Sequence, residues 1–172
     1  MDAISISQGC LHFVKVKNME ALILKMNLVK SYGRVNWVFL ILLLFQIGLP
    51  YEFVEWMMSC VTSTYFVILG NGRPIGFFKG EQGLRQGCPL SPIVFLLVIE
   101  GLRRLIYDAK DKGNIPGVKV CISKYITHIL FVDDVILFGS GRLQDWQAFS
   151  EIISLFCSAT GMEVSSVKFV FF

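Results

Sequence analysis

The first third of the chain alternates between compact apolar runs and short polar breaks. Residues 21–28 (ALILKMNL) are large, apolar and bounded by charge, which predicts a buried strand. A turn at residues 30–35 follows. Two apolar stretches then end at Gly48-Leu-Pro50 and at a serine, which predicts helices over residues 36–46 and 51–63.

The middle of the chain predicts a hairpin, a loop and a long helix. Asn71-Gly72 separates two β-prone segments, 64–69 and 75–79, and is typical of a tight hairpin turn. Residues 80–92 are rich in glycine and proline, which predicts a loop. Apolar periodicity then predicts a helix over residues 93–112.

The last third contains an acidic pair inside an apolar segment. After a turn at 111–117 and a strand at 118–122, two apolar arms flank Asp133 and Asp134, as in a β-hairpin. Asp145 is predicted to cap a helix that reaches Ala159 and ends at Gly161. Residues 162–172 are predicted to be extended. This mixed order favours an α+β fold with helices on one face of a sheet.

Composition narrows the class of protein. The 172 residues suit one domain, and 54% of them are hydrophobic while 17% are charged. The net charge of +3 fits a polyanionic partner, but many ordinary globular proteins carry a similar charge. The five cysteines are scattered without a C-x-x-C pair, which favours reduced thiols and argues against a zinc site.

The most apolar run, residues 37–45, is far shorter than the ~20 residues that a helix needs to cross a bilayer. The first residues also lack the pattern of a secretory signal. We therefore expect no membrane partner and an intracellular location, nuclear or cytoplasmic.

Asp133 and Asp134 are the strongest candidates for chemistry. Two carboxylates at a hairpin tip repel each other, and a hard cation such as Mg²⁺ relieves the repulsion. The alternative is a plain Asp-Asp turn without a metal. The residues alone leave both interpretations open.

Four segments together resemble reverse transcriptases of plant LINE-type (non-LTR) retrotransposons, in the order and spacing of that family. The first and second are close to the family patterns LKLDLSKAYDRVNW and GLRQGDPLSP; the third resembles the F/Y-x-D-D hairpin and the fourth a G-L-x-x-N-x-x-K segment. They are residues 24–37 (LKMNLVKSYGRVNW), 83–92 (GLRQGCPLSP), 128–138 (HILFVDDVILF) and 161–168 (GMEVSSVK).

The resemblance implies a polymerase palm with a ferredoxin-like antiparallel sheet, and residues 1–172 as a partial reverse transcriptase domain. Fingers are expected before residue 1 and a thumb after residue 172. It also implies an RNA template, a DNA primer, dNTP and two Mg²⁺ ions that promote attack of the primer 3′-hydroxyl on the α-phosphate. By resemblance Asp133 binds metal and Asp134 supports it.

The third ligand position of the family is Asn27 in this chain. An amide offers one neutral oxygen where a carboxylate offers a charge and two acceptors. Asn can still ligate a hard cation, so retained binding is the benign alternative. We expect a loss in rate of ~10²-fold or more. Gly33 and Cys88 also replace aspartates of the family patterns.

The resemblance assigns nucleotide binding to Tyr32, Gln86, Gly87 and Lys168. Each residue also has an ordinary interpretation: a packing tyrosine, a helix-entry turn at Gln86 and Gly87, and a solvated lysine. The rival function is a non-catalytic module that keeps the palm fold and binds RNA or protein.

Overall fold

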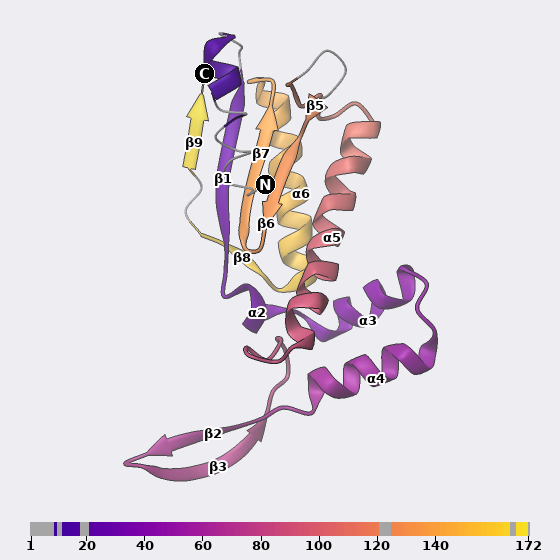
Figure 1. Cartoon of the computed structure of the whole chain (residues 1–172), viewed down its shortest axis with the longest axis vertical. Helices are drawn as coiled ribbons and strands as arrows, with labels where there is room; N and C mark the ends of the chain where they lie inside the picture. Colours follow the sequence, from indigo (N-terminus) through magenta and orange to yellow (C-terminus); the bar gives the residue numbers. More distant parts are fainter. Residues whose placement is uncertain (1–8, 10–11, 18–20, 121–124, 166–167, 172) are drawn as a thin grey trace.

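The computed structural model describes residues 9, 12–17, 21–120, 125–165 and 168–171. Its centre is an antiparallel sheet in which the strands follow the order β6-β7-β1-β8, and β9 also pairs with β1 (Figure 1). These strands are β1 (Leu22–Val29), β6 (His128–Phe131), β7 (Asp134–Gly139), β8 (Glu163–Val164) and β9 (Lys168–Phe171).

Strand β1 lies at the centre of the sheet, as its apolar sequence predicts. Leu24 and Met26 face one side and belong to the main core, whereas Ile23 packs with Val14 and Phe138 on the other. The two-residue period of a strand explains why both faces of β1 are apolar: each is covered.

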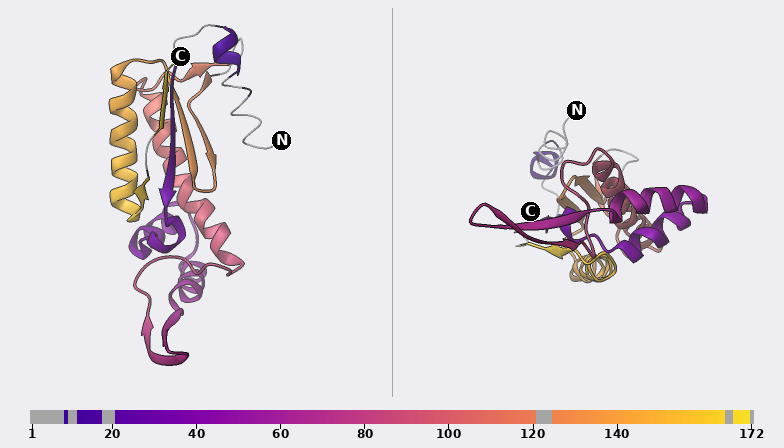
Figure 2. Two further views of the ribbon diagram at one scale, coloured as in Figure 1. Left: turned by 90° about the vertical axis from the view of Figure 1, so that its left-hand side faces the viewer. Right: turned by 90° about the horizontal axis from the view of Figure 1, so that it is seen from below.

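Two helices cover the first of these faces, namely α5 (Leu90–Asp111) and α6 (Leu143–Thr160) (Figure 2). Phe95 of α5 and Phe149 of α6 are both buried in the main core with Leu24. The predicted α+β class with helices packed on one face of an antiparallel sheet is confirmed.

A second group of elements extends away from the sheet (Figures 1 and 2). It consists of α3 (Trp37–Gln46), α4 (Tyr51–Thr62), β2 (Tyr65–Gly70) and β3 (Arg73–Lys79). Asn36 starts α3, because its Oδ1 accepts hydrogen bonds from the backbone N–H groups of Val38 and Phe39. The β2–β3 turn has positive φ at Asn71 and Gly72, so the predicted hairpin is confirmed.

This extension exposes many large apolar side chains. Both strands of the hairpin are exposed along almost their whole length, and Phe77 is 76% exposed. Leu42 of α3 and Trp56 of α4 are more than 60% exposed. A two-stranded hairpin with no further cover is marginally stable in water, so these surfaces suit contact with other polypeptide or ligand.

Several predicted boundaries were wrong. Residues 30–35 contain a short helix, α2 (Ser31–Arg34), and α5 begins three residues before the predicted start. Strand β4 (Val118–Lys119) pairs with β5 (Tyr125–Ile126), and residues 121–122 of the predicted strand lie outside the described residues.

Asp145 does not cap α6. The helix begins two residues earlier, and Arg142 occupies the N-cap position without a side-chain hydrogen bond that caps the helix. The Asp145 carboxylate is buried and accepts hydrogen bonds from the backbone N–H and the hydroxyl of Ser140. It therefore ties the loop after β7 to the first turn of α6. No described helix is long and apolar enough to span a bilayer.

Candidate active site

The pairing of β1 with β7 brings Asn27 opposite Asp134. Asn27 Nδ2 donates to Asp134 Oδ1 over 3.4 Å, and the backbone N–H of Leu28 donates to the carbonyl oxygen of Asp133 over 2.9 Å. Residues more than 100 positions apart thus share one end of the sheet.

The hairpin tip is a two-residue turn formed by Val132 and Asp133, since Phe131 pairs with Asp134. Val132 has a φ of 55°, in the left-handed region that β-branched residues rarely adopt. Such strain costs of order 1–3 kcal/mol and persists only where the surroundings impose it. The rigid pairing of β6 with β7 imposes it here, and it fixes where the two carboxylates emerge.

Asp134 has a second partner of opposite charge. Lys25 Nζ lies 3.4 Å from Asp134 Oδ2, with both side chains at least a third exposed. An exposed pair of this kind contributes little stability. Its chemical effect is larger. The Lys25 ammonium and the Asn27 amide N–H both contact the Asp134 carboxylate, whose oxygens a metal cation would need as ligands.

These residues fit a pair of divalent cations poorly. The described residues hold no group of three or more His, Cys, Asp or Glu side chains that could bind a metal ion. At the end of β1, an amide points its N–H at Asp134 where a hard cation requires an oxygen.

Tyr32, Gln86 and Gly87 line one cavity of about 430 Å³. The ring of Tyr32 stacks on Phe95 at 4.5 Å, and its carbonyl oxygen accepts a hydrogen bond from the N–H of Leu84. Three of the four residues assigned to nucleotide binding therefore share one cavity. Lys168 lies in β9, opposite Lys25 in the strand register.

A family model described as reverse transcriptase (RNA-dependent DNA polymerase) matches residues 2–172. The chain belongs to the reverse transcriptase family. This confirms the resemblance on which the sequence analysis relied.

Known relatives of this reverse transcriptase chain include mobile elements. It is 30% identical over 122 residues to a Pol polyprotein of a type-2 R2 retrotransposable element of Drosophila melanogaster, covering 70% of this chain and 11% of that protein. It is 44% identical over 71 residues to an uncharacterized mitochondrial protein of Arabidopsis thaliana, covering 41% of this chain and 58% of that protein. The chain thus spans 11–58% of the length of these relatives.

Solved telomerase structures share the fold. The structure of Candida tropicalis telomerase with a fragment of telomeric RNA matches 98% of this chain and 29% of that chain, with a TM-score of 0.70 and 14% identity. Candida albicans telomerase matches equally widely with a TM-score of 0.68. The reverse transcriptase chain therefore has the mixed helix and antiparallel sheet architecture of a polymerase palm and spans part of such a protein.

The sequence analysis named Cys88 of this reverse transcriptase chain as a replacement for Asp but missed the electrostatic environment of its thiol. It stands just before α5, and the backbone N–H of Leu90 lowers the pKa of the Cys88 thiol. Burial opposes this shift, and hydrogen bonds from Ser91 and the charge of Arg85 add smaller effects that lower the pKa. The lowered pKa makes this thiol more readily ionised than an ordinary cysteine, at a position where the family pattern carries Asp.

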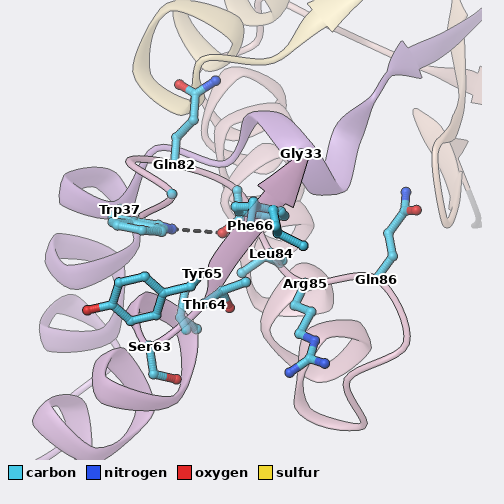
Figure 3. A pocket seen from close by; sticks show the side chains of 14 residues that line it. Gly33, Trp37, Ser63, Thr64, Tyr65, Phe66, Gln82, Leu84, Arg85 and Gln86 are labelled. Atoms are coloured by element: carbon cyan, nitrogen blue, oxygen red, sulfur yellow. Dashed lines mark hydrogen bonds between the residues drawn. The ribbon is translucent and has the colours of Figure 1, made fainter. Parts of the chain in front are cut away.

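A second cavity lies on the other side of the loop at residues 80–86 and was also missed (Figure 3). Its volume is about 570 Å³, and Trp37, Tyr65 and Arg85 are among its lining residues. The indole N–H of Trp37 donates to the carbonyl oxygen of Gly83 over 2.7 Å, which fastens the loop to α3. No sequence motif joins these residues, so only the fold could reveal the cavity.

Proposed function

We propose that this chain derives from the palm of an RNA-directed DNA polymerase of a non-LTR retrotransposon and has lost most nucleotidyl transfer because Asn27 replaces an aspartate. The observation that carries the proposal is the 3.4 Å contact from Asn27 Nδ2 to Asp134 Oδ1. It turns the third ligand position from an acceptor for metal into a donor toward the remaining carboxylate.

The proposal gives the remaining site residues the roles that their positions have in the family pattern. Asp133 and Asp134 would be the residues that hold Mg²⁺, and the cation would stabilise charge on the reacting phosphate. Tyr32, Gln86 and Gly87 would contact the incoming dNTP, since they share one cavity. By the family pattern, Lys168 would lie near the dNTP phosphates or the template strand. An RNA template and a DNA primer are the proposed partners, held with further segments of a longer protein, in the nucleus or cytoplasm.

The test is a titration with Mg²⁺ or Mn²⁺ of the wild-type chain and of Asn27→Asp. The substitution restores one negative charge with almost no change in shape, and removes the N–H that now faces Asp134. We expect tighter binding of the cation by about tenfold or more, an estimate from one added close charge. Calorimetry, or electron paramagnetic resonance for Mn²⁺, measures it.

The matched control is Asn27→Asp combined with Asp133→Asn. The gain should disappear, because the carboxylates at the two positions share a cation. Equal affinity in all three chains would show that Asn27 and Asp133 do not form one metal site, and the proposal would then be abandoned. Restored polymerisation is not required, since primer and template must also be held in line for attack.

A non-catalytic RNA-binding module is the second candidate, and the cavity lined by Arg85 favours it. It predicts salt-dependent RNA affinity that is independent of the charge at residue 27.

A further inference from the structure

The cavity on the hairpin side of the loop at residues 80–86 has the size and lining of a ligand site. Its volume of about 570 Å³ falls within the range of roughly 300–1,000 Å³ that is typical of small-molecule sites. It lies between the start of α3, the base of β2 and the loop itself. Its walls come from segments fixed to one another by backbone hydrogen bonds, from Gly83 to Val35 and from Leu84 to Tyr32.

The lining combines aromatic rings with one positive charge. Figure 3 shows Trp37 and Tyr65 on one side of the cavity and Arg85 on the loop, with its guanidinium directed away from the two rings. Tyr65 is 65% exposed, so its ring face is accessible. Arg85 is the only charged residue among the described lining residues.

Arg85 has no acidic partner in the part of the chain that the structure describes. No carboxylate among the described residues lies within ion-pairing distance of it. Gly33 also lines the cavity, and a Cβ added there would meet no atom within 4 Å. The cavity therefore combines an unpaired cation with unfilled space, which suits an anionic ligand.

The cavity adjoins the proposed nucleotide site. Gln86 lines both this cavity and the one that contains Tyr32 and Gly87. A polymer that passed along the loop would therefore contact both cavities. Aromatic faces with a neighbouring guanidinium are the means by which proteins bind unstacked bases of single-stranded nucleic acid.

We propose that this cavity binds one unstacked base and its phosphate from a single-stranded nucleic acid, with Tyr65 stacking on the base and Arg85 contacting the phosphate. The inference rests on the proposed function, because it assumes a chain that handles nucleic acid. It adds a binding site for the nucleic-acid strand that is separate from Asp133 and Asp134.

The experiment uses a 12-nucleotide RNA with a central 2-aminopurine, and the DNA of the same sequence, both in EDTA. Anisotropy of a terminal dye gives the affinity, and quenching of 2-aminopurine reports stacking. Tyr65→Ala should weaken binding on the order of tenfold and relieve the quenching, whereas Tyr65→Phe should keep both. Tyr51→Ala is the matched control, since Tyr51 is equally exposed and lies outside the cavity.

A second pair of variants tests the charge. Gly33→Asp introduces a carboxylate into the unfilled space and should weaken binding roughly fivefold. Gly33→Asn has nearly the same shape without the charge and should bind as the wild-type chain does. Arg85→Gln should lower both the affinity and its salt dependence, by about one phosphate contact.

Equal affinity for RNA and DNA would show that the cavity contacts the base and the phosphate. Tighter binding of RNA would show that it also contacts the 2′-hydroxyl. Both results support the site. Absence of binding, or equal losses for Tyr65→Ala and Tyr51→Ala, would overturn it. Because EDTA removes divalent cations, this outcome is separate from the metal titration of Asn27→Asp, and either proposal can fail alone.

Discussion

Acidification should destabilise this fold through His128. The side chain lies at the start of β6, its Nδ1 is 3.0 Å from the hydroxyl of Thr127, and its ring meets Tyr107 edge to face at 5.3 Å. Burial, followed by the positive charges of Arg103 and Lys110 against the opposing charge of Glu100, lowers the pKa of His128 from 6.5 to about 4.

The direction of the pH effect on stability follows from the lowered pKa of His128. Between pH 6.5 and 4 the unfolded chain binds a proton at His128 that the folded chain does not bind, so the stability of the fold decreases as the pH falls. The stabilising contribution of His128 is complete above the unfolded pKa of 6.5. It is lost progressively as the pH falls to about 4, and below that pH the loss does not increase further. From pH 7 to pH 5 the two pKa values give a loss of about 2 kcal/mol.

The assay is urea unfolding of dilute protein at pH 7, 6 and 5, followed by tryptophan fluorescence. His128→Phe keeps a ring against Tyr107 but cannot be protonated, so most of the loss between pH 7 and 5 should vanish. His12→Phe is the control, because His12 is exposed and its replacement should leave the pH dependence in place. Equal pH dependence in the wild-type chain and His128→Phe would refute the reasoning.

Three further results are expected. Asn36→Ala should lower the free energy of unfolding by about 1 kcal/mol, because two backbone N–H groups at the start of α3 lose their acceptor; an unchanged urea midpoint would contradict this. Gly117→Ala should cost more than Gly113→Ala in the same assay: both glycines have positive φ, but only at Gly117 would the new Cβ lie 2.6 Å from a backbone oxygen. The purified chain should self-associate, and Leu42→Lys should reduce the association seen by sedimentation, since this side chain is 64% exposed; a wild-type monomer at high concentration would count against the idea.

Local signals predicted the elements that depend on near neighbours. The strand at β1 follows from its own apolar residues, and the β2–β3 turn follows from Asn71 and Gly72, which tolerate positive φ. Gly161 ends α6 with a φ of 76°, as its position after the last apolar residue predicted.

Features that depend on distant partners were not predictable in the same way. Asp145 has the chemistry of a cap, but the loop after β7 offers it the hydroxyl and the N–H of Ser140, which its sequence position does not reveal. The left-handed Val132 is dictated by strand pairing and not by its own preference. The proximity of Asn27 to Asp134 could be predicted only from the family pattern. The cavity that Tyr65 and Arg85 share could be predicted neither from a sequence pattern nor from periodicity.

The central position of β1 has a consequence for synthesis of the protein. Lys25 of β1 and Asp134 of β7, whose side chains form an ion pair, are 109 residues apart. At the usual ribosomal rate of ~5–20 residues per second, the strand at the middle of the sheet waits roughly 5–20 s for its neighbour to be made. During that time an apolar β-prone segment has no partner, so the nascent chain should depend on a chaperone until the acidic hairpin emerges.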